Sequence, residues 1–459
     1  MRGVLRFRLL LLLLCAAGLT ALPAAAQARA PEAAPRPAAA QQAPGAAPAA
    51  EKPAAKPEEN RQSGQYTLSH ERYEKAVAYS RARYTLYFVS FAWGLLILVV
   101  LLRLGLAAKF RDLAEAASDK RFLQALVFVP LLLGTIGTLE LPTEVYGQVL
   151  SLRYAQSVQG WGSWLWDWTK GEFVEMILGT LLALILFAVI RSSPRRCWFY
   201  FWAAALPIAL ATLFLSPWVI DPLFNKFEPL DATHPELVTA IEKVVQRAGL
   251  QIPRERMFLM QASLKENSIN AYVTGFGASK RVVVWDTTIQ KATTEETLFI
   301  FGHEMGHYVL NHIRNAFLFI GVVLLGAFYL AFRGLHAALD RWGRLWKVHG
   351  VEDWAALPVM LLLLSVILFL LSPVFSGFSR MQEHEADVYG LEVIHGLVPD
   401  SAEVAAHAFQ VLGEVDLSDP NPPAFITFWL YSHPPLADRL VFAHTYDPWS
   451  KGQAPRYVK

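Results

Sequence analysis

The chain has 459 residues, of which 54% are hydrophobic and only 17% are charged. Because soluble globular proteins carry about 25% charged residues, this composition argues against a purely soluble protein. The 41 Lys and Arg residues and 39 Asp and Glu residues leave a net charge of +2, which gives no basis for nucleic-acid binding. The two cysteines, Cys15 and Cys197, cannot build a disulfide framework.

The amino-terminal part of the chain contains two segments of unusual composition. Residues 1–28 begin with arginines, continue with an apolar run and end in small residues, which is the layout of a secretory signal peptide. An uncleaved membrane anchor is the alternative, and both interpretations place the following residues outside the cytoplasm. Residues 29–63 consist largely of Ala, Pro, Gln, Glu and Lys, so we expect a disordered linker there.

Six further apolar stretches are long enough to cross a bilayer, whose hydrocarbon core of about 30 Å needs roughly 20 helical residues. They cover approximately residues 84–108, 122–141, 173–190, 198–219, 316–333 and 355–377. Buried helices of a large soluble core could imitate one or two such runs, but not six together at a mean hydropathy of +0.31. The sequence therefore predicts a mainly α-helical, polytopic membrane protein, with four spans in residues 64–219 and two in residues 316–377.

Basic residues concentrate in three short loops, which lie on one side of the membrane if the six spans alternate. They are Lys109, Arg111, Lys120 and Arg121 in the first loop, Arg191, Arg195 and Arg196 in the second, and Arg341, Arg344 and Lys347 in the third. The positive-inside rule makes this side cytoplasmic. We therefore expect a bacterial inner-membrane protein whose active site lies on the extracytoplasmic side. An additional span within residues 142–172 would invert this topology, although the tryptophans at 161–168 fit an interfacial aromatic belt.

The residues at 303–307 read H-E-M-G-H, which is an H-E-x-x-H motif. On a helix, two histidines four positions apart project from one face and can bind a single Zn²⁺, while the glutamate between them lies beside the attacking water. Thr293 and the glutamate three positions later predict a capping box at the start of this helix. The motif predicts a zinc hydrolase with His303 and His307 as ligands and Glu304 as general base.

A hydrolytic zinc site needs a third protein ligand and one open position. A metzincin would have a histidine ten residues after His303, and that position is Ile313. On a continuous helix, His312 would point away from the ligands, so we expect it to be an exposed or capping histidine. Two spans separate the histidines from an acidic run at 379–387, so this run returns to the same side of the membrane. Its candidate ligands are Glu383, which is preferred, and the alternatives Glu385 and Asp387.

Five groups of short motifs are distributed over roughly residues 120–445. They are P-L-F-N-K-F-E-P-L at 222–230, N-A-Y at 270–272 before R-V-V-V-W-D at 281–286, H-E-M-G-H at 303–307, S-R-x-x-E-x-x-A-D at 379–387, and S-H-P-P at 432–435 with Arg439. Taken together, they resemble the integral-membrane zinc metalloproteases of the M48 type, especially the Ste24 or CAAX prenyl protease 1 branch. As a set these motifs are specific for this family.

This resemblance implies roles for further residues. It implies that Glu383 is the third zinc ligand and that Asp387 orients one of the liganding histidines. It also implies that His433 and Arg439 line the active site, where His433 would stabilise the oxyanion and Arg439 would contact substrate. For the fold, it implies a helical barrel around an intramembrane chamber, joined to a zincin-like metalloprotease domain with a small β-sheet.

Residues 268–273 and 281–286 are β-rich and are separated by T-G-F-G-A, which predicts a β-hairpin. In the family that the chain resembles, the strand that carries Asn270, Ala271 and Tyr272 binds peptide substrate by backbone pairing. An exposed strand edge captures an extended peptide through main-chain hydrogen bonds, with little sequence selectivity. Without the resemblance, an ordinary structural hairpin is the preferred interpretation.

These observations predict a zinc-dependent, membrane-embedded endopeptidase with one Zn²⁺ per chain, whose partners are membrane-associated polypeptide substrates and the lipid bilayer. Its metalloprotease domain is discontinuous, with the H-E-M-G-H helix in residues 220–315 and the third ligand in residues 378–459. CAAX-type processing of prenylated carboxy-terminal tails is one alternative. The other is a transporter or scaffold with a structural zinc, although such sites are usually closed by four ligands that are often cysteines.

Overall fold

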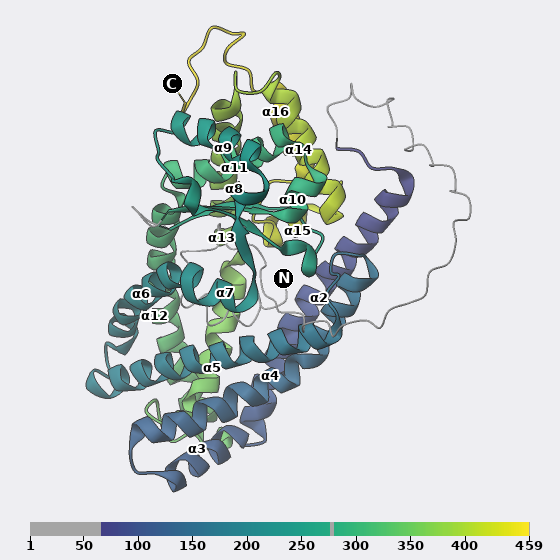
Figure 1. Ribbon diagram of the computed structural model, residues 1–459. Helices are drawn as coiled ribbons and strands as arrows, with labels where there is room; N and C mark the ends of the chain where they lie inside the picture. The colour runs from purple at the N-terminus through teal and green to yellow at the C-terminus, as the bar shows by residue number, and fades with distance from the viewer. Residues whose placement is uncertain (1–65, 276–279, 459) are drawn as a thin grey trace, which may run out of the picture.

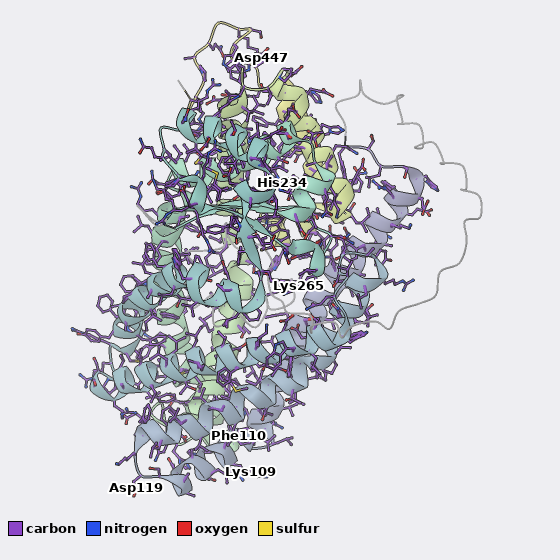
Figure 2. The ribbon with its side chains drawn as sticks, viewed as in Figure 1. Lys109, Phe110, Asp119, His234, Lys265 and Asp447 are labelled. Atoms are coloured by element: carbon purple, nitrogen blue, oxygen red, sulfur yellow. The ribbon has the colours of Figure 1, made fainter. Side chains whose placement is uncertain are left out.

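The computed structural model describes residues 66–275 and 280–458. These residues form a bundle of long helices and a domain of shorter helices around a small sheet, which occupy the lower and upper parts of Figure 1. In Figure 2, Lys109 and Asp119 mark the free end of the bundle, and Asp447 marks the far end of the upper domain. The predicted signal peptide and linker lie outside the described residues.

Six helices are long and apolar enough to cross a membrane, as the hydropathy pattern predicted. They are α2 (His70–Arg103), α4 (Arg121–Arg153), α5 (Trp161–Ser192), α6 (Cys197–Leu215) with its continuation through η1 (Ser216–Ile220) and α7 (Asp221–Phe224), α12 (His312–Trp346) and α13 (Leu357–Ile394). A shorter helix, α3 (Leu106–Ala117), connects α2 to α4. The expected fold class, a mainly helical polytopic membrane protein, is confirmed.

Most of these helices continue beyond the apolar stretch that predicted them. A helix satisfies its own backbone hydrogen bonds, so it can leave the bilayer and pack against a water-facing domain without unfolding. Hydropathy detects only the lipid-facing part of such a helix. The tryptophans at 161–168 form the first turns of α5. Residues 142–172 contain the end of α4, a short connection and the start of α5, so they form no additional span.

The three basic loops lie at the same end of the helical bundle. The Arg111 guanidinium of α3 donates to the Lys347 carbonyl at 3.0 Å and to the Asp353 carboxylate at 2.6 Å, which joins the first loop to the third. Cys197, directly after the second loop, packs in the same apolar cluster as Trp354, directly after the third. The alternation of spans that the charge pattern assumed is therefore present in the described helices.

The upper domain contains a four-stranded mixed sheet in the order β1-β2-β4-β3. The strands are β1 (Phe227–Pro229), β2 (Met257–Met260), β3 (Ala271–Thr274) and β4 (Arg281–Trp285). β2 and β4 run parallel, whereas β1 pairs with β2, and β3 with β4, in antiparallel fashion. Tyr272 lies opposite Val283 in the β3–β4 pair, so the predicted hairpin is confirmed. Because β3 is an edge strand of the described sheet, one side of its backbone has no neighbouring strand.

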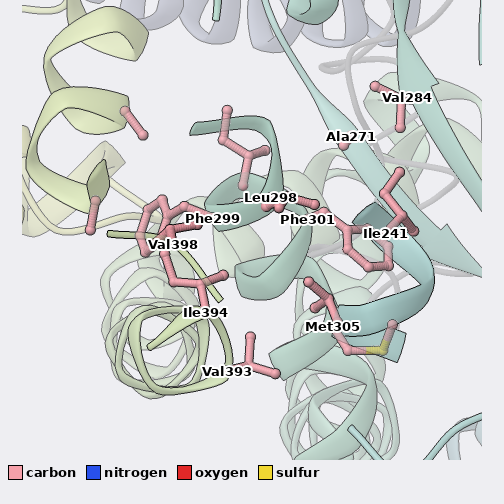
Figure 3. Packing of buried hydrophobic residues seen from close by; sticks show 14 of the residues in the cluster. Ile241, Ala271, Val284, Leu298, Phe299, Phe301, Met305, Val393, Ile394 and Val398 are labelled. Atoms are coloured by element: carbon pink, nitrogen blue, oxygen red, sulfur yellow. The ribbon is translucent and has the colours of Figure 1, made fainter. Parts of the chain in front are cut away.

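Helices cover the sheet and enclose the main core of the domain. They are α8 (Leu230–Thr233), α9 (Pro235–Arg247), α10 (Asp286–Lys291), α11 (Thr294–Val309), α14 (Ser401–Asp416), α15 (Ala424–Leu430) and α16 (Leu436–Thr445). Single 3-10 turns are η2 (Arg254–Arg256), η3 (Ala262–Leu264) and η5 (Trp354–Ala356). Ala271 and Val284 of the sheet share this core with Ile241 of α9 and with Phe301 and Met305 of α11, as Figure 3 shows.

Helices α12 and α13 are among the spans that connect directly to this domain. Helix α12 begins three residues after α11 ends, and α13 is one continuous helix of 38 residues that runs from the bundle into the upper domain. At a rise of 1.5 Å per residue, α13 is about 57 Å long. Its carboxy-terminal part, which ends at Ile394, packs in the core of the domain. The same helix is thus a membrane span at one end and part of the domain core at the other.

Candidate active site

Helix α11 carries the H-E-M-G-H motif, and the predicted capping box defines where this helix starts. The Thr293 hydroxyl accepts a hydrogen bond from the Glu296 N–H at 3.2 Å, and the Glu296 carboxylate accepts one from the Thr293 N–H at 2.9 Å. A capping box satisfies backbone N–H groups that have no partner within the helix. Since the helix starts at a defined residue, its turns have a defined phase, which places His303 and His307 on the same face.

The three residues that were predicted as metal ligands come together in the structure. The candidate ligand atoms of His303, His307 and Glu383 all lie within 4.8 Å of one another, and no other group of this kind was found in residues 66–275 and 280–458. His303 Nε2 is 3.2 Å from Glu383 Oε2, and His307 Nε2 is 3.6 Å from Glu383 Oε1. The two Nε2 atoms are 3.2 Å apart. All three side chains are buried, and Glu383 is only 1% exposed.

This set of donors fits a divalent cation. The Oε2 atom of Glu383 is buried and has no hydrogen-bond partner in the described part of the chain, although the Nε2 atoms of His303 and His433 both lie 3.2 Å away. A buried carboxylate oxygen without a partner is costly unless a cation compensates for it. Burial lowers the pKa of His307 to about 3, which favours its neutral ring. Burial also disfavours the charged form of His303, but Asp387 and Glu383 outweigh it and raise the pKa of this ring to about 10, so a bound cation would take the place of its proton. Two imidazoles and one carboxylate form the donor set of several catalytic zinc sites.

A buried ion pair supports His303 from behind. Asp387 Oδ1 lies 2.8 Å from His303 Nδ1, and Arg439 donates from Nε to Asp387 Oδ2 at 2.8 Å and from Nη2 to Oδ1 at 2.5 Å. The Arg439 guanidinium also lies 4.3 Å from the centre of the Phe409 ring. A carboxylate at Nδ1 leaves Nε2 of the same ring to face the metal. Asp387 thus contacts His303, while its role in orienting a zinc ligand and the contact of Arg439 with substrate stay predictions.

The two residues that were predicted to be catalytic surround the same group of ligands. Glu304 is partly exposed, unlike the buried histidines on either side of it. Burial raises the pKa of Glu304 to about 7. A carboxyl with a pKa near 7 can both accept and return a proton at neutral pH. His433, in the loop before α16, keeps 54% of its side chain exposed while its Nε2 approaches Glu383. The catalytic roles of both residues stay predictions.

Close packing of α11 against α13 lets two helices contribute ligands to one site. A Cβ atom added at Gly390 of α13 would lie 2.9 Å from the backbone nitrogen and 3.1 Å from the Cα of His303. A Cβ atom added at Gly306 of α11 would lie 3.2 Å from the Cα of Ala386. Because these neighbours are backbone atoms, they cannot move aside by changing a rotamer. Glycine at both positions is therefore what lets Glu383 approach the histidines so closely.

The structure contradicts the expectation for His312. This histidine is neither exposed nor a cap, since it is only 1% exposed and its Nδ1 lies 3.0 Å from Nδ1 of His307. The expectation assumed one continuous helix, but α11 ends at Val309 and α12 starts at His312. Asn311 between them adopts the left-handed conformation, with φ of 59° and ψ of 33°. That break turns the His312 side chain back toward the ligands.

The predicted substrate-binding strand lies beside α11, the helix that carries His303 and His307. β3 contacts α11, and its Ala271 is buried in the main core. Tyr272 points to the opposite face of the sheet, where it packs with Trp285. Asn270, just before the strand, accepts hydrogen bonds at its carbonyl from the Trp285 N–H at 3.1 Å and from the Thr288 hydroxyl at 2.7 Å. The backbone pairing of this strand with peptide substrate stays a prediction.

Two family models match the chain. The model described as Peptidase family M48 matches residues 231–446, which include the His303, His307 and Glu383 group and the small sheet from β2 onward. The model described as CAAX prenyl protease N-terminal, five membrane helices, matches residues 55–226. The two matches meet near the start of β1, where the chain first passes from the helical bundle into the upper domain.

The chain is also similar to individual proteins over most of their length. It is 36% identical over 374 residues to the uncharacterized metalloprotease YhfN of Bacillus subtilis, which covers 81% of this chain and 85% of that protein. It is 29% identical over 386 residues to the CAAX prenyl protease 1 homolog of Arabidopsis thaliana, with 81% and 87% covered. The crystal structure of S. mikatae Ste24p matches with a TM-score of 0.69 at 26% identity, covering 81% of this chain and 88% of that one. With the six apolar helices and the His-His-Glu group, these matches show that the chain belongs to peptidase family M48, as a multi-pass membrane metalloendopeptidase.

Proposed function

We propose that the chain is a zinc endopeptidase that cleaves membrane-associated polypeptides where His303, His307 and Glu383 converge. The observation that carries the proposal is the buried Oε2 atom of Glu383, which faces two imidazole nitrogens without a hydrogen bond. The peptidase family implies a metal, and the nitrogen and oxygen donors favour zinc. One Zn²⁺ per chain would be held by these three side chains.

The roles of the surrounding residues follow from their positions. When bound, Zn²⁺ polarises a scissile carbonyl and lowers the pKa of a water molecule to about 7. Glu304 then accepts a proton from the attacking water and passes it to the leaving amine. His433 donates a hydrogen bond to the oxygen on which negative charge develops, a type of contribution worth about 3 kcal/mol in other hydrolases. Asp387, held by Arg439, keeps the His303 ring oriented.

The edge strand suggests how a substrate is presented. An extended peptide that pairs with β3 would lie along the strand that contacts α11, so its backbone would pass close to the metal ligands. Such binding uses main-chain groups and therefore accepts many sequences. The candidate ligand Glu383 lies on α13, which is also the last membrane span, and this position favours substrates that are themselves at the membrane.

The basic loops support an extracytoplasmic site in a bacterial inner membrane. They share one end of the bundle, and the His303, His307 and Glu383 group lies on α11 and α13 in the domain at the other end (Figure 1). A fusion after Lys459 tests this sidedness. A reporter enzyme that is active only in the periplasm should be active when it is fused at this position. Several relatives are named CAAX prenyl protease 1, so prenylated tails are the second candidate substrate. A cytoplasmic reporter signal would favour that candidate.

Replacing Glu304 by glutamine tests the mechanism directly. The Glu304→Gln variant should keep its zinc, because Glu304 is not a ligand, and should lose turnover of a reporter peptide by at least about 100-fold. Glu295→Gln is the matched control, since Glu295 is an exposed residue of the same helix, and it should behave like the wild type. Glu304→Gln protein that cleaves at the wild-type rate would exclude this mechanism.

Metal removal separates an enzyme from a scaffold with a structural zinc. Chelation should abolish peptide cleavage, and zinc should restore it without refolding, because three ligands hold the metal on a preformed domain core. A structural site would instead be closed by a fourth protein ligand, and the group found in the described residues has three. Loss of zinc without any loss of cleavage would contradict the proposed function.

A further inference from the structure

The two histidines of the motif differ in what supports them. Asp387, a carboxylate, lies at Nδ1 of His303, whereas Nδ1 of His307 faces Nδ1 of a third histidine, His312, at 3.0 Å. His312 has a further partner on its other side, because its Nε2 lies 3.2 Å from Glu385 Oε2. Three polar side chains thus form a chain of contacts that leads away from the ligand site.

The donors and acceptors along this chain of contacts are mutually consistent. A metal at His307 Nε2 requires that the proton of the neutral ring be on Nδ1. His307 Nδ1–H then donates to His312 Nδ1, which must be the unprotonated nitrogen of its ring. The proton of His312 is therefore on Nε2, where it donates to the Glu385 carboxylate. Each of the three groups has a partner of the opposite kind in a single arrangement of protons.

The surrounding structure holds His312 in this place. Asn311 provides the left-handed residue that separates α11 from α12. The Gln382 side-chain amide donates to the His312 carbonyl at 3.1 Å, which ties the start of α12 to α13. Glu385 lies on the same helix, and its Oε1 is 3.7 Å from Arg456. The position of His312 is thus determined by three helices and not by its own rotamer alone.

We propose that His312 and Glu385 are positioning residues that orient His307 for metal binding, as Asp387 orients His303. This inference rests on the proposed function, because it takes His307 as a zinc ligand. Neither residue belongs to the group of candidate ligands, which is His303, His307 and Glu383. In metalloenzymes, removing a hydrogen-bond partner of a liganding histidine typically costs 10- to 100-fold in metal affinity or activity. The pair should therefore be needed for tight zinc binding.

Zinc affinity of the full chain, measured by competition with a fluorescent chelator, tests this inference. His312→Phe keeps a flat ring but removes the acceptor, and it should weaken zinc binding by about 10- to 100-fold. His312→Asn keeps an acceptor oxygen close to the position of Nδ1 but loses Glu385, so its loss should be smaller. Adding Glu385→Gln to His312→Phe should cost nothing further, because the pair acts as one unit. The visible spectrum of Co²⁺-loaded protein should shift in His312→Phe, which a purely structural role would not predict.

His384→Gln is the matched control. His384 lies between Glu383 and Glu385 on α13, but its ring packs on Phe442 and is exposed, so its loss should leave zinc affinity unchanged. Zinc binding by His312→Phe and His312→Asn within twofold of the wild type would overturn the inference. Additive losses in the double variant would also overturn it. A wild-type chain that binds no zinc would instead overturn the proposed function itself, so the two failures are distinguishable.

Discussion

Replacing Gly390 by alanine perturbs the contact that brings α11 and α13 together. The new Cβ atom would lie 2.9 Å from the backbone nitrogen of His303 and 3.1 Å from its Cα. Carbon atoms in protein interiors pack best at about 3.5–4.0 Å, so the two helices must separate by roughly 0.5–1 Å. Neither obstacle is a side chain that could rotate away.

The cost of this separation can be estimated. Overpacking of a core costs about 1–3 kcal/mol, and alanine returns about 0.5–1 kcal/mol of helix stability, so the free energy of unfolding should fall by up to about 2.5 kcal/mol. Zinc binding should suffer more, because His303 is displaced from Glu383 on the other helix. If about 1.4 kcal/mol of the strain is relieved by moving α11, zinc affinity falls tenfold.

The assays are thermal unfolding in detergent and chelator competition for zinc. Gly326→Ala is the control, since Gly326 also lies within a helix, α12, and nothing lies within 4 Å of its added Cβ atom. That variant should be neutral or slightly stabilised and should bind zinc like the wild type. The reasoning about close packing is refuted if Gly390→Ala melts and binds zinc as Gly326→Ala does.

Three further variants test other features of the domain. Arg439→Met leaves Asp387 buried without its partner, so the free energy of unfolding should fall by about 3–5 kcal/mol, and zinc affinity should fall as well. An unchanged chemical denaturation curve would contradict this. Thr293→Ala removes the capping box and should lower the free energy of unfolding by about 1 kcal/mol, which the same assay measures; an unchanged free energy of unfolding would contradict it. Burial raises the pKa of Asp416 to about 6, so the folded state binds this proton more tightly than the unfolded chain and stability should fall as pH rises from about 4 to about 6. Asp416→Asn should flatten that slope in melting temperature, and an identical slope would show that another group causes it.

Local patterns predicted the parts of the site that lie on one helix. The spacing of His303 and His307 and the capping box at Thr293 depend on contacts within a few residues, so they could be read from the sequence. The sequence pattern alone could not show which of the later acidic residues, Glu383, Glu385 or Asp387, is the third ligand. That choice depends on which face of α13 packs against α11, and that face is set by glycines whose partners lie 80 or more positions away.

His312 shows why a helical wheel can mislead. The wheel placed this residue on the wrong side because it assumed that the turns continue past Val309. A single residue, Asn311, adopts the left-handed conformation and resets the direction of the chain. Asparagine is one of the few residues other than glycine that tolerates this conformation, so it was the available signal. In the same way, the extension of α13 past its apolar stretch was invisible to hydropathy, because the domain that covers it is built from distant segments.

Helix α13 also makes the bilayer a mechanical part of the metal site. From Leu357 to Glu383 the helix rises about 39 Å, so a change of one degree in its tilt moves the carboxylate by about 0.7 Å if the lower end stays fixed. Helices adjust their tilt to bilayer thickness. Helix α11 packs against the upper part of α13 and also contacts strand β3, so a tilt of α13 would pull the histidine ligands against the sheet. Bilayer thickness is therefore expected to change the distances between the ligand atoms of His303, His307 and Glu383. The geometry of the metal site in a detergent micelle should then differ from its geometry in a membrane.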